Sequence, residues 1–411
     1  MAAPPNRPSA WRAWLKPRRD RFIKWAHRQF CRLPLSRRLV LCEAGWGASY
    51  SCNPRGISEY LMTRADPRWT LVWAFTNPRA VQVPRGVIKV RYGGLAFHYV
   101  AARAGVLITN VNFADHIAKR PGALHIQTMH GTPIKTLGLD IPGEFKSQRG
   151  KDAFLRRNRR WDYLLAPSQY TADCAQRAFQ HRATVLPFGY PRNDVLVAAH
   201  SPDRILRVRE GIGIPASRRV ILYAPTWRGG GTESLGDGVA GFVDWFRRTD
   251  PCGGRYALLV RMHPLTKVRP AAAAEAGTGC VIDVSSYPDN RELMLLADVL
   301  VTDYSSIVFD FGLLERPVAL YCFDYDHYVH ESRGVYMDIV KESPWPTYRS
   351  IDELTAQLPT DLNRGLDLEA HRRFMGRYAE WDRGNAAERL CREVLVPWRL
   401  AGSAAAVTAP R

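Results

Sequence analysis

The sequence predicts an α/β protein made of two Rossmann-like halves that face each other across a cleft. The chain has 411 residues, more than one hydrophobic core usually organises, so two domains are expected. Its composition of 46% hydrophobic and 24% charged residues is typical of a globular protein. From Arg38 onwards, short β-rich runs alternate with helical patterns, which is the arrangement of parallel α/β domains.

The two halves are predicted from two series of strands. The first half spans residues 38–200 and the second spans residues 201–395, with a Ser-Pro-Asp turn between them. Residues 396–411 are rich in Ala and Pro, and we expect them to form a disordered tail. The first series of strands lies at 39–42, 71–74, 87–90, 106–108, 125–128, 163–165 and 184–186, with helices such as 54–63 and 96–104 between them, and the second series lies at 220–223, 257–260, 281–283, 299–301 and 318–321.

Residues 1–37 are predicted to form a basic arm. Residues 1–40 hold eleven Lys and Arg against a single Asp, which is more than half of the net charge of +19. Aromatic residues such as Phe22 and Trp25 lie among these cations, a pattern that favours a membrane-surface segment in contact with anionic lipid. Pro17 would interrupt a helix, so we expect a short amphipathic helix beginning just after it. A disordered basic tail, or a helix packed on the main body, is the alternative.

Other classes of protein and site are disfavoured by what the sequence lacks. No apolar run approaches the roughly 20 residues that span a bilayer, and the basic N-terminus lacks the apolar core of a secretory signal, so a cytoplasmic protein is expected. No groove-reading or base-stacking module follows the arm, so no nucleic-acid partner is expected. The eight cysteines contain no C-x-x-C pair, which favours reduced thiols. Asp324 and Asp326 match a D-x-D motif by spacing only, so no metal site is predicted.

The first candidate site follows the strand at 125–128. Residues 127–135 read Gln-Thr-Met-His-Gly-Thr-Pro-Ile-Lys, which places His130 at the carboxyl end of a strand, where open α/β sheets bind ligands. A histidine can accept a proton near neutral pH. Thr132 and Lys135 are candidate contacts for the acceptor or a phosphate. An ordinary strand-to-helix turn with a hydrogen-bonded histidine is the alternative interpretation.

Three further candidates follow strands of the second half. A Gly-rich loop after 220–223 carries Thr226 and Arg228 and can wrap a phosphate. Arg261 and His263 follow the next strand and suit a developing phosphate charge. The third candidate is the Thr-Asp-Tyr-Ser-Ser run at a predicted helix N-terminus, which favours anion binding through Thr302, Asp303, Ser305 and Ser306. The alternative interpretations of the three candidates are, in the same order, a surface loop, a turn histidine and simple helix capping.

Together these motifs resemble the CDP-glycerol glycerophosphotransferase family, the teichoic-acid and capsule polymerases and primases. The resemblance covers about residues 40–340. Near its start the family commonly has Ser-Asp-Asn-Pro, whereas this chain has Cys52 in place of the Asp, followed by Asn53 and Pro54. The other segments that carry the resemblance are 104–110, 127–137, 161–163, 189–196, 223–228, 261–264, 302–306 and 333–338.

The resemblance implies a GT-B-like fold, in which the first half binds the acceptor and the second half holds most of the donor nucleotide. It also implies two essential histidines that face each other across the cleft, and these correspond to His130 and His263. His130 is then the general base for the acceptor hydroxyl, while His263 and Arg261 steady the transferred phosphate. Thr302, Ser305 and Ser306 bind the donor diphosphate, with Arg228 and Lys135 as weaker candidates for the same role.

The reaction implied by the resemblance is attack by an acceptor hydroxyl on the phosphorus of CDP-glycerol or a related CDP-alditol, which expels CMP. The acceptor is expected to be lipid-linked or polyanionic, and the enzyme to be peripheral at the cytoplasmic face of the plasma membrane, with its arm on anionic lipid. No tightly bound cofactor is needed, although dissolved Mg²⁺ can assist. A GT-B glycosyltransferase with a nucleotide-sugar donor, a CDP-ribitol donor, and a binding protein without catalysis stay open as alternatives.

Overall fold

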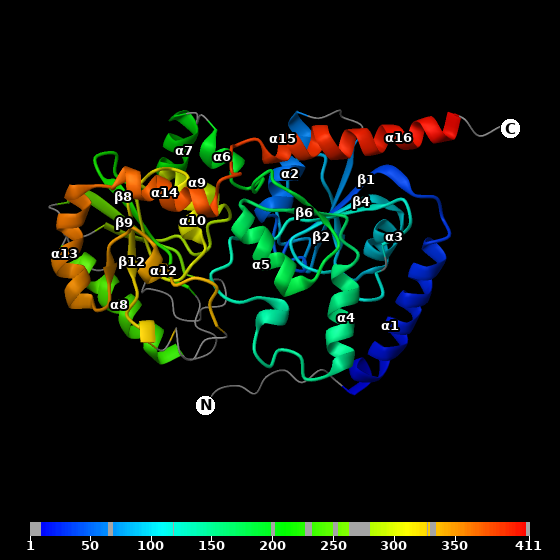
Figure 1. Ribbon diagram of the computed structural model, residues 1–411, viewed down its shortest axis with the longest axis horizontal. Helices are drawn as coiled ribbons and strands as arrows, with labels where there is room; N and C mark the ends of the chain where they lie inside the picture. Colours follow the sequence, from blue (N-terminus) through cyan, green and yellow to red (C-terminus); the bar gives the residue numbers. More distant parts are fainter. Residues whose placement is uncertain are drawn as a thin grey trace.

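The chain folds into two α/β halves, each built around one parallel sheet (Figure 1). This arrangement confirms the predicted fold class. The computed structural model describes residues 10–64, 69–117, 119–198, 202–226, 232–249, 254–262, 280–326, 328 and 334–407.

The first sheet has seven strands in the order β3-β2-β1-β4-β5-β6-β7. The strand order reverses between β1 and β4, so a crevice for ligands is expected outside the carboxyl ends of these two strands. The central strands are buried runs of apolar residues, as both faces of a parallel sheet require. The strands are β1 (Ser36–Glu43), β2 (Thr70–Phe75), β3 (Ile88–Arg91), β4 (Ala104–Thr109), β5 (Leu124–Gln127), β6 (Tyr163–Leu165) and β7 (Thr184–Leu186), and every strand predicted for this half is found within a few residues of its expected bounds.

The second sheet has six strands in the order β10-β9-β8-β11-β12-β13. Here the order reverses between β8 and β11, which marks a second crevice at their carboxyl ends. Strand β13 (Thr347–Tyr348) was not predicted, because two residues carry no readable periodicity. The other strands are β8 (Arg219–Tyr223), β9 (Tyr256–Val260), β10 (Cys280–Asp283), β11 (Val299–Thr302) and β12 (Val318–Tyr321).

The helices cover both faces of each sheet and enclose its apolar cores. Several begin at a short polar side chain that accepts a hydrogen bond from a backbone N–H group, as Ser147, Ser168 and Asp289 do. The helices are α1 (Ala10–Phe30), α2 (Cys52–Thr63), α3 (Leu95–Arg103), α4 (Gln148–Asn158), α5 (Gln169–Phe179), α6 (Asp194–Val197), α7 (Pro202–Ile212), α8 (Thr232–Thr249), α9 (Asn290–Leu296), α10 (Ile307–Gly312), α12 (Ile339–Glu342), α13 (Ile351–Arg364), α14 (Leu368–Tyr378), α15 (Ala386–Leu390) and α16 (Val396–Val407).

The C-terminal segment crosses back from the second half to the first. Figure 1 shows α15 and α16 running over the N-terminal half, on the side of α2 and β1. A π-helical turn, Cys391–Leu395, joins these two helices. Leu390 and Leu395 are fully buried in the same apolar core as Val40 of β1. Two expectations are therefore corrected: residues after 386 pack with the first half, and residues 396–407 are helical rather than a disordered tail.

The arm also differs from its prediction. Helix α1 runs through Pro17 as one element instead of beginning after it. Its last turns pack on α3, where Ala26 and His27 are buried and the His27 Nδ1 lies 3.1 Å from the carbonyl oxygen of His98. Phe30 meets the ring of Tyr99 edge to face at a centroid distance of 5.4 Å. The end of the arm is therefore a folded part of the first half.

Within the described part of the chain, no helix combines the length and the apolar character needed to cross a membrane. The same residues contain no cluster of three or more His, Cys, Asp or Glu side chains arranged for a metal ion. The seven cysteines among them are free thiols.

Candidate active site

The loop after β5 carries His130, and a buried amide fixes its path. The side chain of Asn53, at the start of α2, donates to the carbonyl oxygens of Thr128 at 2.8 Å and Met129 at 3.1 Å. Met129 has a left-handed backbone with φ of +51°, and its N–H donates to the side chain of Gln127 at 3.0 Å. These bonds compensate for a conformation that non-glycine residues rarely adopt, and they present His130 at the carboxyl edge of the sheet.

The His130 ring is exposed, and one of its nitrogens has an identified partner. Its Nδ1 atom lies 3.3 Å from the carbonyl oxygen of Asn110, a residue that follows β4. Because a carbonyl oxygen can only accept, Nδ1 carries the hydrogen in this contact. The lone pair of the neutral ring is then on Nε2, the tautomer that a general base requires.

Arg192 connects the His130 loop to the second half. Its Nη1 donates to the His130 carbonyl oxygen at 2.5 Å, and its Nη2 lies 2.7 Å from the Asp310 carboxylate in α10. Its backbone N–H donates to Asn53 at 3.2 Å. Burial alone would lower the pKa of the guanidinium, but the acidic groups around it, Asp310 above all, together outweigh burial and raise the pKa. Arg192 is therefore a permanently charged link between the two halves.

The two halves approach each other closely beside His130. A Cβ atom placed on Gly131 would lie only 2.7 Å from the hydroxyl oxygen of Ser306 and 3.3 Å from its Cβ. Glycine at this position therefore allows the Ser305–Ser306 turn of the second half to meet the His130 loop of the first. Two motifs that are about 170 residues apart in the sequence form one site.

The segment after His130 is also joined to the second half. Lys135 pairs with Val335 in an isolated antiparallel bridge, and its Nζ lies 4.6 Å from the centre of the Tyr328 ring. Tyr328 stacks in turn on Tyr304, which follows β11. Thr132 is buried within this segment. The predicted contacts Lys135 and Thr132 thus lie at the junction of the halves.

Thr302 and Asp303 hold a neighbouring loop rather than facing outwards. The Thr302 hydroxyl donates to the Ala224 carbonyl oxygen at 2.6 Å. The Asp303 carboxylate accepts the Thr226 N–H at 2.9 and 3.0 Å and also the Thr226 hydroxyl. Both residues are buried, so they position the end of β11 against the loop after β8. These two strands form the crevice of the second sheet, where Ser305 and Ser306 stay partly exposed.

Arg261 follows β9 and is half-buried. Its Nη1 donates to the carbonyl oxygens of Val284 at 3.2 Å and Tyr287 at 2.8 Å. Burial lowers the pKa of its guanidinium, and Asp289 acts in the opposite direction. Two other predicted residues, His263 and Arg228, lie outside the described residues.

A four-residue ion-pair network forms a second junction between the halves. Arg55 of α2 lies 3.0 Å from Asp289, and Glu59 of α2 lies 3.1 Å from Arg291 of α9. Arg55 and Glu59 are 2.7 Å apart, and Asp289 and Arg291 are 2.8 Å apart. Burial opposes the charge on Asp289, but Arg291 and Arg55 outweigh burial and lower its pKa. Each of the four charged side chains thus contacts one opposite charge in its own half and one in the other half.

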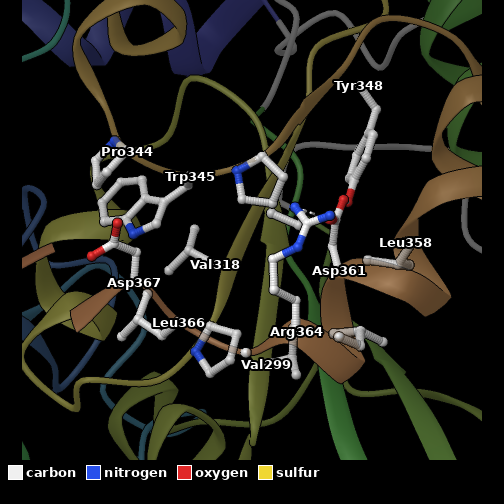
Figure 2. A pocket seen from close by; sticks show the side chains of 15 residues that line it. Val299, Val318, Pro344, Trp345, Tyr348, Leu358, Asp361, Arg364, Leu366 and Asp367 are labelled. Atoms are coloured by element: carbon white, nitrogen blue, oxygen red, sulfur yellow. Dashed lines mark hydrogen bonds and ion pairs between the residues drawn. The ribbon is translucent and has the colours of Figure 1, made fainter. Parts of the chain in front are cut away.

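A cavity of about 460 Å³ lies at the opposite edge of the second sheet (Figure 2). Val299 and Val318, the first residues of β11 and β12, line it together with Trp345. Three of its polar members are engaged with each other, because Asp361 accepts from Tyr348 and pairs with Arg364. Parallel sheets bind ligands at the carboxyl ends of their strands, so this cavity at the amino ends is not the candidate site.

Three residues of the site were not assigned a role from the sequence: Asn53, Arg192 and Asp310. Asn53 and Arg192 lie in segments that carry the family resemblance, which was the available signal. Asp310 carried no signal, because a single acidic residue in a short apolar helix can equally well cap or solubilise it. Its role depends on Arg192, which is 118 residues away in the sequence.

Comparison with known proteins assigns the chain to a family. The family model described as CDP-Glycerol:Poly(glycerophosphate) glycerophosphotransferase matches residues 25–396. The teichoic acid glycerol-phosphate transferase of Staphylococcus aureus is 33% identical over 370 residues, covering 87% of this chain and 93% of that protein. The teichoic acid poly(glycerol phosphate) polymerase of Bacillus subtilis is 34% identical over 333 residues, covering 78% of this chain but 44% of that protein.

A solved structure agrees with the sequence relatives. The wall teichoic acid polymerase TagF superposes with a TM-score of 0.82 at 29% identity, covering 94% of this chain and 96% of that chain. A variant of the same polymerase soaked with CDPG has a TM-score of 0.78 at 28% identity, covering 89% of this chain and 90% of that chain.

Proposed function

The chain belongs to the CDP-glycerol:poly(glycerophosphate) glycerophosphotransferase family, and we propose that it transfers glycerol phosphate from CDP-glycerol to a hydroxyl group of a cell-envelope polymer or of its lipid-linked precursor. It is an enzyme of the kind that its relatives represent. The observation that carries the proposal is the approach of Gly131 to Ser306, because it brings the His130 base and the serine turn of the second half into one site.

The proposed chemistry uses the two halves for different partners. His130 Nε2 takes the proton from the acceptor hydroxyl as its oxygen forms a bond to the phosphorus that carries glycerol. The bond between this phosphorus and the bridging oxygen of the diphosphate breaks, and CMP leaves with that oxygen. Ser305 and Ser306 contact the donor diphosphate at the crevice between β8 and β11. His263 and Arg261 are proposed to steady the phosphoryl charge, with Arg228 as a further contact.

CMP release from purified protein tests the reaction. CDP-glycerol, CDP-ribitol and UDP- and GDP-sugars are supplied in turn, with a membrane-lipid extract as acceptor. We expect CMP from CDP-glycerol and a loss of at least about 100-fold in His130→Ala, within the range for a general base. The His130 side chain is exposed, so the unfolding midpoint of this variant should equal that of the parent. UDP or GDP release without CMP would instead establish the glycosyltransferase alternative.

We also propose that α1 contacts the anionic cytoplasmic leaflet of the plasma membrane. Phe22 and Trp25 of α1 expose 54% and 55% of their surface, whereas Ala26 and His27 of the same helix are buried. Exposed cations flank these two rings: Arg18, Arg19, Arg21, Lys24 and Arg28. Aromatic rings set among cations suit the interface of an anionic bilayer.

Vesicle sedimentation tests the membrane contact. The full chain should pellet with vesicles that contain anionic phospholipid, and less strongly as the salt concentration rises. Phe22→Ser/Trp25→Ser should reduce the bound fraction several-fold. Leu206→Ser is the matched control, since Leu206 is equally exposed at 53% on the basic helix α7. Equal loss in both variants, or salt-independent binding to neutral vesicles, would contradict the proposal.

A further inference from the structure

A cavity of about 420 Å³ lies beside His130 in the first half, a volume within the range of small-molecule sites. It opens at the carboxyl ends of β1 and β4, the point where the order of the first sheet reverses, so topology also predicts a ligand there. Six of the fourteen residues that line it are aromatic. The aromatic residues are Trp46, Tyr92, Phe113, Phe154, Trp161 and Phe179.

Trp46 is held at this cavity by an unfavourable turn. Gly45, Trp46 and Gly47 all have positive φ, and the value of +54° for Trp46 is rare for a bulky side chain. Even so, 58% of the Trp46 surface is exposed. Its indole Nε1 donates to the Asn112 carbonyl oxygen at 3.2 Å, which fixes the direction of the ring. A large apolar ring kept exposed by a strained turn indicates a ligand-binding role.

A buried acidic residue precedes the same turn. Glu43 ends β1 with its side chain fully buried, and it accepts from the Thr109 hydroxyl at 3.1 Å. The neighbouring Asn110 accepts the Gly45 N–H at 2.9 Å through its side chain and contacts His130 through its carbonyl oxygen. The Trp46 turn and the His130 ring are therefore both attached to the same residue, Asn110.

The opposite wall is equally well ordered. Trp161 is buried, and its indole Nε1 donates to the Asn112 side chain at 2.9 Å. The Asn112 amide donates in turn to Asn158 at 2.9 Å. The charged residue that lines the cavity, Arg157, already pairs with Asp115 at 3.1 Å. The cavity thus combines aromatic faces with amide groups.

We propose that this cavity binds a pyranose ring of the acceptor, and that the hydroxyl attacked in the reaction belongs to that ring. The proposal rests on the proposed function and deepens it by naming the acceptor class. A pyranose has apolar C–H faces that fit aromatic rings, while the hydroxyls at its edge fit Asn110 and Gln127. An open-chain alditol phosphate has a dianionic or monoanionic end and no flat apolar face, so this lining does not match it.

The rim shows where the rest of the acceptor continues. Three arginines, Arg156, Arg157 and Arg160, lie within 3.1–3.8 Å of the single carboxylate of Asp115, which leaves an excess of positive charge. This excess suits a phosphate that follows the bound ring. His116 follows Asp115, and the centre of its ring lies 6.4 Å from the centre of the His27 ring in α1. The rim of the cavity therefore continues to the helix that is proposed to contact the membrane.

Ligand-observed NMR and CMP release test the proposal separately. Alkyl hexopyranosides and alkyl N-acetylhexosaminides should show saturation transfer from the full chain, and glycerol 1-phosphate should not. Trp46→Ala should weaken glycoside binding about tenfold or more, the loss typical of a buried aromatic anchor, while Trp46→Phe should retain most of it. Leu206→Ala, an exposed apolar residue remote from the cavity, is the control.

In the CMP assay, glycosides should stimulate turnover of CDP-glycerol, and Trp46→Ala should raise KM for the glycoside rather than KM for CDP-glycerol. The proposal is overturned if no glycoside binds, if Trp46→Ala binds as the parent does, or if glycerol phosphate oligomers stimulate CMP release and glycosides do not. Glycoside binding that needs Trp46, with no CMP from CDP-glycerol, would retain the cavity assignment and refute the proposed function.

Discussion

Replacing Arg192 by Ala should both destabilise the protein and slow the reaction, because this side chain connects the two halves at the site. The variant removes the ion pair to Asp310 at 2.7 Å and the hydrogen bond to the His130 carbonyl oxygen at 2.5 Å. It leaves the Asp310 carboxylate, with 9% side-chain exposure, without its opposite charge.

The magnitude follows from burial. Breaking a buried ion pair by removing one partner costs about 3–5 kcal/mol, since the remaining charge is desolvated without compensation. Arg372 supplies a matched control, because it makes an equally short bidentate pair with Glu315 but at side-chain exposures of 61% and 42%. Arg372→Ala should cost no more than about 1 kcal/mol, as exposed pairs usually do.

Urea unfolding followed by circular dichroism measures the loss of stability, and CMP release measures the effect on the reaction. We expect a clearly lower urea midpoint for Arg192→Ala and a kcat reduced at least about tenfold, because the His130 loop loses its attachment to the second half. The double variant Arg192→Ala/Asp310→Ala should lose less free energy of unfolding than the two single variants lose together, and the difference should be about 1–3 kcal/mol.

The result that would refute this reasoning is a similar midpoint for Arg192→Ala and Arg372→Ala together with an unchanged kcat. Additive losses in the double variant would show that Arg192 and Asp310 do not act as a pair. Arg192→Lys separates the effect of charge from that of geometry. This variant keeps the positive charge and should therefore recover part of the stability. The recovery should be incomplete, because a lysine cannot bond to Asp310 and the loop carbonyl in the same planar arrangement.

Two further predictions concern single positions. Gly131→Ala should lower kcat/KM for CDP-glycerol at least several-fold with little change in the urea midpoint, because the added methyl group would lie 2.7 Å from the Ser306 hydroxyl; kinetics equal to the parent would contradict the close approach. Asp382 is partly buried, and desolvation raises its pKa to about 7, so the folded state keeps the proton to a higher pH than the unfolded chain does. The free energy of unfolding should therefore fall as pH rises from about 4 to about 7, and Asp382→Asn should flatten this decrease by up to about 4 kcal/mol; an unchanged slope would show that Asp382 does not titrate in this window.

The sheets were predictable because their information is local. The strands of both halves are short apolar runs next to turn residues, and a parallel sheet must bury such runs on both faces. Predicted strand β12 (Val318–Tyr321) has the same bounds in the structure. Among the described residues, the strand β13 and the path of the chain ends differ from the prediction. Two residues have no readable period, and Pro17 disfavours a helix only statistically.

The candidate site was partly predictable for the same reason. His130, Thr302 and Ser306 follow predicted strands, and parallel strands present their carboxyl ends at one edge of a sheet. The sequence could not show that Asp303 would point inwards to Thr226, because an aspartate in such a turn can equally face a ligand or a backbone N–H group. Which role it takes depends on where another loop ends.

By itself, the sequence determined the two-sheet α/β architecture, the position of His130 at a strand end and the family to which the motifs point. The tertiary structure alone decided how the halves are joined: Arg192 to Asp310, Gly131 to Ser306, and the C-terminal helices returned to the first half. It also decided which aromatic residues surround the cavity beside His130. Periodicity and turn chemistry act over a few residues, whereas these contacts join residues more than one hundred positions apart, and only packing of the whole chain brings such residues together.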